Sequence, residues 1–145
     1  MATISKATTT WQGDLAKGSG LVSTASGVVK DAPVSWARRA EERSAGTSPE
    51  ELIAAAHASC FSMAFAARLA KNQTPPTSLT VTVNVTFDKG EAGFKIMSSA
   101  IDVVGVVPGL DLEAFRRIAE DAKDNCPVSA ALKGNVAMSV TATLS

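Results

Sequence analysis

Residues 47–63 decide the fold, and they read Thr47-Ser48-Pro49-Glu50-Glu51-Leu52-Ile53-Ala54-Ala55-Ala56-His57-Ala58-Ser59-Cys60-Phe61-Ser62-Met63. Ser48 can cap a helix, Pro49 suits the first helical position, and Glu51 stands three residues after Ser48, as in a capping box. Alanines continue the helical pattern to about Lys71, and two prolines at 75–76 end it. The helix is small or apolar on nearly every face, which is typical of a helix surrounded by protein.

The residues on either side of this helix predict strands and two shorter helices. Apolar residues alternate strictly with polar ones from Leu79 to Phe87, the pattern of a strand with one buried face. Further strands are expected at 8–11, 21–24, 27–29, from 94 onward and at 136–142, with a bulge between 98 and 101, and helices at 110–123 and 127–133. Residues 31–46 are expected to form an irregular connection or a short edge strand. The order β-β-α-β-β-α-β, with water on one face of the strands, predicts an α+β fold with antiparallel sheets.

The length and the net charge of the chain limit the classes of function that it can have. The chain has 145 residues, the size of one ordinary globular domain, so we expect a single domain over 1–145. Its 14 basic and 14 acidic residues leave no excess of positive charge, which argues against nucleic-acid and membrane-surface binding. The N-terminus has no apolar signal core, and the uncharged stretch 52–67 is shorter than a membrane span. We therefore expect a cytoplasmic protein.

The chain contains two cysteines and one histidine, too few for a four-ligand zinc site within one chain. Cys60 lies in the middle of the long helix, and His57, three residues earlier, could share its face as part of a Cys/His pair. Cys126 precedes Pro127 and so lies at or next to the N-cap of the short helix, where a thiolate is favoured. Each residue also has a structural explanation, because a cysteine on an alanine-rich helix is usually a small core residue and a histidine often packs between helices.

Several charged residues precede or open the long helix. Glu50 and Glu51 are explained by their place in its first turn, where carboxylates interact favourably with the helix dipole. Arg38, Arg39 and Arg43 are most simply solvated loop charges. An arginine, however, keeps its charge and can stabilise a thiolate or hold a peroxide oxygen.

Taken together, these motifs resemble the OsmC/Ohr family of thiol peroxidases. Residues 47–63 closely resemble the family's first cysteine helix, and its second cysteine motif is matched by Cys126-Pro127-Val128-Ser129 followed by Leu132. The N-terminal hairpin of the OsmC branch is similar to Trp11-Gln12-Gly13-Asp14 and Gly20-Leu21-Val22-Ser23-Thr24, and His57 points to the same branch. The resemblance spans essentially the whole chain. It implies an OsmC-like fold, in which antiparallel sheets wrap around a long central helix bearing the first cysteine in an intertwined homodimer.

The resemblance also implies a reaction. The family reduces organic hydroperoxides, and hydrogen peroxide usually less well. Cys60 would be the peroxidatic cysteine, which becomes a sulfenic acid, and Cys126 the resolving cysteine, which closes a disulfide with it. An external dithiol, in this family a lipoyl group on a protein, would then reopen the disulfide. No cofactor or metal ion is expected.

The family's activating arginine and its glutamate partner match Arg39 and Glu50. The family pattern is roughly Arg-Phe-Glu-Gly, whereas this chain has Arg39-Ala40-Glu41-Glu42 and one more residue before Thr47, so Arg38 is an alternative. Glu50 and Cys60 are ten residues apart, about 15 Å along a straight helix, so Glu50 cannot reach its own Cys60 directly. It can act through an arginine or on a second subunit, which favours the homodimer.

Two other functions fit the same residues. The protein could be a non-enzymatic small-ligand-binding or redox-sensing protein in which the cysteines are structural. An intersubunit metal site built from His57, Cys60 and Cys126 is the other possibility, and the lack of a close-spaced ligand pair argues against it.

Overall fold

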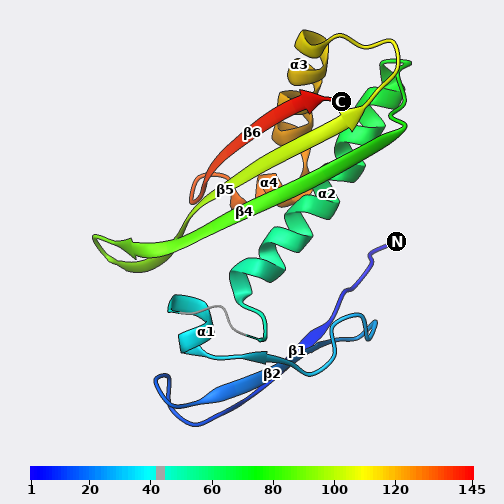
Figure 1. Ribbon diagram of the computed structural model, residues 1–145. Coiled ribbons are helices and arrows are strands. Elements are labelled where there is room, and N and C mark those ends of the chain that lie inside the picture. The colour runs from blue at the N-terminus through cyan, green and yellow to red at the C-terminus, as the bar shows by residue number, and fades with distance from the viewer. Residues whose placement is uncertain (42–44) are drawn as a thin grey trace. The chain divides into compact units, whose positions relative to one another are not determined.

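The computed structural model describes residues 1–41 and 45–145, and the chain divides into two compact units. We call Met1–Leu52 the N-terminal unit and Ile53–Ser145 the C-terminal unit (Figure 1). Glu42 and Arg43, which belong to the charged segment and the arginine motif, lie outside the described residues.

The N-terminal unit is a small antiparallel sheet followed by one short helix. Its elements are β1 (Ala7–Gln12), β2 (Ser19–Thr24), β3 (Ala32–Val34) and α1 (Trp36–Ala40), and the strand order is β1-β2-β3. The edge strand expected within 31–46 is β3, whereas α1 was not predicted. Its signal is Ser35, whose hydroxyl accepts a hydrogen bond from the Arg38 N–H as an N-cap.

The strand expected at 27–29 does not form. Gly27 has a φ of +76°, and the Thr24 N–H donates to the Val29 carbonyl, so this segment is a tight turn. Apolar composition alone suggested a strand, but the glycine permits the chain to reverse direction here.

Helix α2 (Pro49–Lys71) begins in the N-terminal unit and continues through the C-terminal unit. The Ser48 hydroxyl accepts the Glu51 N–H at 3.1 Å, as the capping pattern predicts. Helix α2 has 23 residues, and its most apolar stretch of 18 residues reaches a mean hydropathy of 1.4, so it is long and apolar enough to cross a membrane, a test that the core helix of a soluble protein also passes. Phe61, Phe65 and Leu69 are fully buried along one of its faces.

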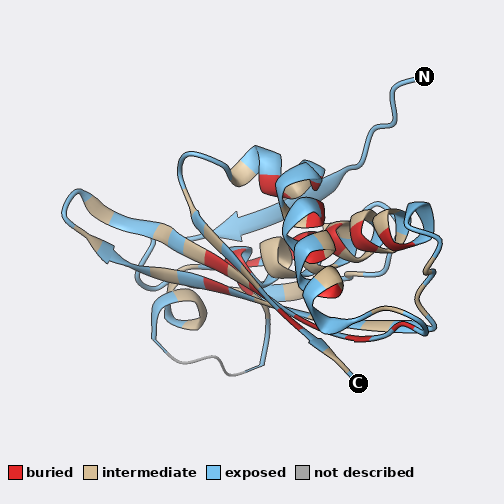
Figure 2. Cartoon of the chain, turned by 90° about the horizontal axis from the view of Figure 1, so that it is seen from above, coloured by how far each residue is buried: buried red, intermediate tan, exposed pale blue. Residues whose placement is uncertain are grey.

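The opposite face of α2 is exposed within the chain. Met63 is 68% exposed, and its neighbours on this face are small residues, namely Ala55, Ala56, Ser59 and Ala67 (Figure 2). The sequence predicts a helix covered all round, and one chain covers it on one side only.

The C-terminal unit is a three-stranded sheet with helices on one face. Its strands are β4 (Ser78–Gly90), β5 (Gly93–Val106) and β6 (Ala137–Leu144), in the order β4-β5-β6, and its further helices are α3 (Leu112–Asn125) and α4 (Pro127–Leu132). β4 and β5 form the predicted hairpin. Thr86 pairs with Ser98 and Phe87 with Ile96, so the extra residue of the bulge is Met97, one residue before the expected range.

Strand β6 corrects the expectation that every strand pairs antiparallel. It lies parallel to β5, from Ser98 opposite Ala137 to Gly105 opposite Leu144. The physical reason is the connection, because α3 and α4 carry the chain back along the sheet before β6 begins, which is the crossover that parallel strands require. Alternation of apolar and polar residues shows that one face of a strand is buried, but it does not show whether an edge strand pairs parallel or antiparallel with its neighbour.

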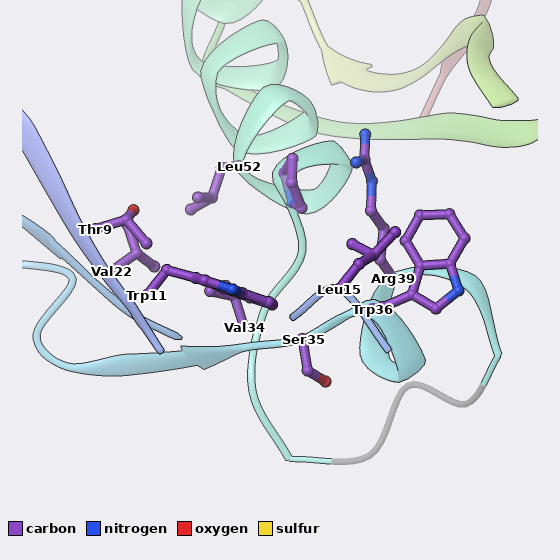
Figure 3. Close-up of a pocket in the computed structure, with 10 residues that line it drawn as sticks. Thr9, Trp11, Leu15, Val22, Val34, Ser35, Trp36, Arg39 and Leu52 are labelled. Carbon is purple, nitrogen blue, oxygen red and sulfur yellow. The ribbon is translucent and has the colours of Figure 1, made fainter. Parts of the chain in front are cut away.

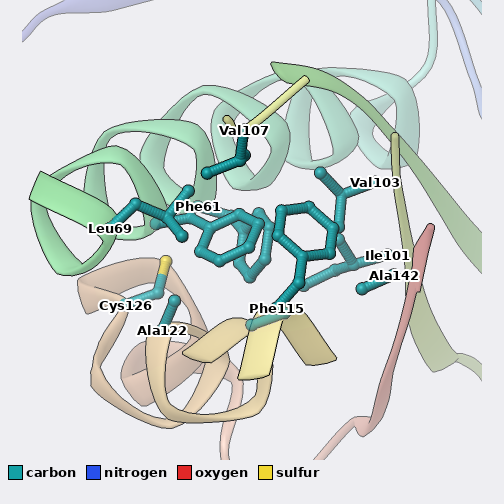
Figure 4. Packing of buried hydrophobic residues seen from close by; sticks show 11 residues of the cluster. Phe61, Leu69, Ile101, Val103, Val107, Phe115, Ala122, Cys126 and Ala142 are labelled. Carbon is teal, nitrogen blue, oxygen red and sulfur yellow. The ribbon is translucent and has the colours of Figure 1, made fainter. Parts of the chain in front are cut away.

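The core of the C-terminal unit lies between the sheet and its helices (Figure 4). It joins α2 and α3 to β5 and β6 through Phe61, Phe65, Leu69, Ile101, Val103, Val107, Phe115, Ala119, Ala122, Cys126 and Ala142. The Phe65 ring packs against Phe61 and Phe115 with centroids 5.5 and 4.9 Å apart. The predicted α+β class is therefore confirmed.

Candidate active site

The two cysteines lie together in the C-terminal unit. Cys60 is half-buried in the middle of α2, and Cys126 is fully buried at the N-cap of α4. Their thiols are in hydrogen-bond contact, and the Val128 N–H, in the first turn of α4, donates to the Cys60 sulfur. Figure 4 shows the Cys126 sulfur pointing toward α2. Cys60 and Cys126, which are 66 positions apart in the sequence, are thus neighbours, and the Cys60 thiol is the more accessible of the two.

The C-terminal unit does not by itself favour the Cys60 thiolate. Burial is the largest influence and raises the pKa of the Cys60 thiol, and the adjacent Cys126 raises it further. The Val128 N–H acts in the opposite direction and lowers the pKa, because it stabilises the negative sulfur. Within this unit the balance of these influences favours the neutral thiol of Cys60.

His57 is buried one helical turn before Cys60. Its Nδ1 is 2.7 Å from the Ser99 Oγ and its Nε2 is 2.8 Å from the Ser129 Oγ. Burial lowers the pKa of His57 below its ordinary value of 6.5. Both ring nitrogens are thus engaged by serines, and the imidazole bridges β5 and α4. The sequence leaves open whether His57 pairs with Cys60 or packs in the core, and the structure shows it packed with both ring nitrogens in contact with serine hydroxyls.

Arg39 and Glu50 form an ion pair in the N-terminal unit. The Arg39 Nε and Nη2 both donate to the Glu50 Oε1, at 3.0 and 2.8 Å. The Glu50 side chain is 2% exposed and that of Arg39 is 32% exposed. The other carboxylate oxygen, Glu50 Oε2, is buried and accepts no hydrogen bond from any residue that the structure describes.

Arg38 is engaged elsewhere. Its Nε donates to the Ala45 carbonyl at 2.5 Å, and its Nη1 contacts the Ser35 hydroxyl at 3.3 Å. Arg38 thus binds the loop before α2, and Arg39 is the arginine that pairs with Glu50. The Arg-x-Glu spacing in the sequence favours the same choice.

Arg39 also lines an apolar pocket within the N-terminal unit (Figure 3). The pocket holds about 350 Å³ and is walled by Thr9, Trp11, Leu15, Val22, Val34, Ser35, Trp36, Arg39, Pro49 and Leu52. Trp36 and Arg39 are three residues apart on α1, so their side chains share one face of the helix. The pocket combines apolar walls with one guanidinium group, which suits a small molecule with an apolar body and a polar end.

Sequence reasoning missed two residues of this region, Ser99 and Ser129. Ser129 is part of the second cysteine motif, so its position carried a signal. Ser99 lies where the apolar phase of its strand slips, and an inward-facing serine on a buried strand position is the available hint. Among the described residues, no group of three or more His, Cys, Asp or Glu side chains is arranged to hold a metal ion.

Comparison with known proteins identifies the family. The family model for the OsmC-like protein matches residues 41–141. Peroxiredoxin OsmC of Escherichia coli (strain K12) is 44% identical over 128 residues, which cover 88% of this chain and 89% of that protein. Organic hydroperoxide resistance protein-like 1 of Staphylococcus saprophyticus is 38% identical over 92 residues, which cover 63% of this chain and 64% of that protein.

The fold agrees with this likeness. The crystal structure of the organic hydroperoxide resistance protein OhrB of Bacillus subtilis superposes with a TM-score of 0.72 at 28% identity, covering 97% of this chain and 98% of that one. The structural match thus covers nearly the whole chain, and the sequence match with the Escherichia coli protein covers 88% of it. The chain belongs to the OsmC/Ohr family.

Proposed function

We propose that this protein is a cysteine-based peroxidase that reduces organic hydroperoxides to alcohols, and hydrogen peroxide less efficiently, in defence against oxidative stress. The observation that carries the proposal is the contact between an accessible and a buried thiol, Cys60 and Cys126. The names of the relatives, peroxiredoxin OsmC and organic hydroperoxide resistance protein, support the same chemistry.

The reaction proceeds in two steps on the protein. The Cys60 thiolate attacks an oxygen of the O–O bond, and the other oxygen leaves with a proton as the alcohol, so that Cys60 becomes a sulfenic acid. The Cys126 thiol then attacks the Cys60 sulfur, a disulfide forms and water leaves. A dithiol, such as the dihydrolipoyl group of a lipoylated protein, exchanges with this disulfide, restores both thiols and becomes the cyclic disulfide.

Arg39 supplies the positive charge that the first step needs. The environment of Cys60 within the C-terminal unit raises the pKa of its thiol on balance, and a neighbouring guanidinium group lowers it. Glu50 holds two N–H groups of Arg39 and so fixes the direction of the guanidinium. Glu50 and Cys60 are ten positions apart on one helix, so Glu50 acts through Arg39.

A homodimer completes this arrangement. The face of α2 that one chain leaves exposed carries small residues and Met63, and a second copy of α2 is the natural cover for it. In such a dimer the Arg39–Glu50 pair of one subunit can serve the cysteines of the other. We further infer that each subunit is one OsmC-like domain over residues 1–145 and that the protein is soluble and cytoplasmic.

The apolar pocket favours a second candidate function, the binding of a small ligand without turnover. In that case Cys60 and Cys126 are structural or sense oxidants, and the pocket around Arg39 holds the ligand. The two functions differ in one measurable respect, because only a peroxidase consumes hydroperoxide catalytically when a dithiol is present.

The test is an assay of cumene hydroperoxide with dihydrolipoamide as the reductant. We expect turnover by the wild-type protein, none by Cys60→Ser, and a single oxidation without disulfide closure in Cys126→Ser. Counting free thiols after one equivalent of hydroperoxide separates the two variants. Wild-type protein that keeps both thiols after this treatment would exclude the peroxidase and leave the binding protein.

A further inference from the structure

His57 is a fully buried titratable group that the proposed reaction does not use. It is the chain's one histidine, and it lies between three elements. The imidazole belongs to α2, its Nδ1 meets the Ser99 hydroxyl of β5, and its Nε2 meets the Ser129 hydroxyl of α4. Both serines are themselves buried, at 0% and 2% exposed.

The hydrogen-bonding capacity of this imidazole is used up. A neutral histidine has one nitrogen that donates and one that accepts, and each serine hydroxyl can take either part. No ring nitrogen is left to take a proton from Cys60, so His57 is not its general base. The side chain is instead a fixed link between β5 and α4.

The link ends in the first turn of α4, which begins at its N-cap Cys126 and contacts the Cys60 sulfur through the Val128 N–H. Ser129 is the third residue of α4. His57 and Cys60 are three residues apart and share one face of α2. The link therefore ties the turn of α2 that carries Cys60 to the turn of α4 that carries Cys126.

We propose that His57 is a positioning residue for disulfide closure, holding the first turn of α4 against α2 so that the Cys126 thiol stays in contact with the Cys60 sulfur. The proposal rests on the proposed function and names a residue for its second step. In that step the Cys126 sulfur displaces the sulfenic oxygen of Cys60, which leaves as water, and the S–S bond forms. Without the link, α4 moves more freely and the sulfenic acid persists.

Ser129→Ala and Ser99→Ala form a matched pair for the test. Each substitution removes one serine hydroxyl that contacts the His57 imidazole, so each should lower the melting temperature of the protein by a similar amount. Only Ser129→Ala releases α4. We expect the sulfenic acid, formed with one equivalent of hydroperoxide and trapped by dimedone, to persist about 2- to 10-fold longer in Ser129→Ala, as expected for one hydrogen bond. In Ser99→Ala its lifetime should change less than twofold.

A second measurement needs no peroxidase activity. The protein disulfide is equilibrated with mixtures of reduced and oxidised dithiothreitol, and the ratio that opens half of it is recorded. We expect the disulfide of Ser129→Ala to be half open at a ratio of reduced to oxidised dithiothreitol about 2- to 10-fold lower than the ratio for wild type. Wild-type protein whose disulfide opens and closes in this way but that consumes no hydroperoxide would contradict the proposed function. The role of His57 in holding α4 would then still be decided by comparing Ser99→Ala with Ser129→Ala.

Substitution of His57 itself completes the test. Gln offers an acceptor and a donor, so His57→Gln should recover part of the closure rate that His57→Leu loses. If His57→Leu fails to fold, the serine pair still decides. Equal effects of Ser99→Ala and Ser129→Ala on sulfenic acid lifetime and on the dithiothreitol ratio would overturn the proposal and make His57 a purely structural residue.

Discussion

The two units of the chain differ in what they bury. In the N-terminal unit the buried side chains include the Glu50 carboxylate and the Ser48 hydroxyl, and Val22 is its one buried hydrophobic residue among those that the structure describes. The C-terminal unit buries a continuous cluster of aromatic and aliphatic side chains, with Cys126 among them. Strand β1 is exposed along its whole length, whereas β5 buries alternate residues.

The two units therefore differ in what they contribute to folding stability and in how they affect the reactivity of Cys60. The N-terminal unit has 52 residues, and those that the structure describes include one buried hydrophobic side chain. Such a unit gains little from its own core, so its apolar pocket and exposed strand need cover from elsewhere. The C-terminal unit has the core and the sulfur chemistry, but it raises the pKa of the thiol that should react. The proposed function assigns the missing positive charge to Arg39 of the N-terminal unit.

The largest expected effect comes from removing the charge of the N-terminal unit. Arg39→Ala should slow the oxidation of Cys60 by hydroperoxide about 10- to 1000-fold at neutral pH, because an adjacent positive charge lowers a thiol pKa by about 1–3 units. Stopped-flow measurement of sulfenic acid formation gives the rate. Arg39→Lys should retain part of it, since it keeps the charge and loses the two-donor contact with Glu50.

Arg38→Ala is the matched control. Arg38 binds the Ala45 carbonyl and the Ser35 hydroxyl, so its loss should affect the loop and leave the oxidation rate within about twofold of wild type. Equal losses of rate in Arg38→Ala and Arg39→Ala would remove the special role of the Arg39–Glu50 pair. The division of labour between the two units would then no longer hold.

An intermediate effect is expected from the core of the C-terminal unit. A Cβ on Gly105 would meet the Phe115 Cζ at 2.5 Å, and the Phe115 ring is fully buried and cannot yield. Gly105→Ala should therefore lower the free energy of unfolding by about 1–3 kcal/mol. Urea denaturation measures the loss, and Val104→Thr, on the exposed face of the same strand, should change it by less than about 0.5 kcal/mol. A Gly105→Ala protein as stable as wild type would mean that α3 is loosely packed on the sheet.

The smallest effect is a pH dependence from His57. Burial holds its pKa in the folded protein below 6.5, so the unfolded chain takes up a proton at a higher pH than the folded chain. The free energy of unfolding should carry the full contribution of neutral His57 above pH 6.5 and decrease as the pH falls below that value. Urea denaturation at pH 7.5 and 5.5 should show this decrease in wild type and a smaller one in His57→Gln. Parallel pH profiles for the two proteins would show that His57 is readily protonated in the folded state.

Local patterns predicted much of the fold. The Ser48-Pro49 helix start, the alternation from Leu79 to Phe87 and the helix after Pro108-Gly109 all appear where expected. What they could not predict was the direction of β6, because strand direction depends on the crossover and not on the strand's own residues. The helix α1 was missed because five residues are too few to show a period.

Part of the arrangement of the candidate site could be expected from the sequence, and the catalytic roles of its residues stay predictions. Cys60, Cys126 and Glu50 were named from their motifs, and the Arg39–Glu50 contact occurs in the structure. Ser99 was not predictable, because its importance comes from a partner 42 residues away that only the packed sheet brings near. Hydrogen bonds between buried polar side chains are set by tertiary packing and leave almost no trace in local sequence.

Parallel pairing of β6 with β5 places Cys126 on a connection that must form before the sheet is complete. The β4–β5 hairpin closes over a short turn, whereas β6 can join the sheet only after the crossover through α3 and α4 has formed. Cys126 lies on that crossover, so we expect the two thiols to meet before β6 completes the sheet. The chain has only two cysteines, and an oxidant that reaches it during synthesis can therefore close only the native pair within one chain. Premature oxidation would shorten the search for the crossover, because the closed disulfide already brings its ends together.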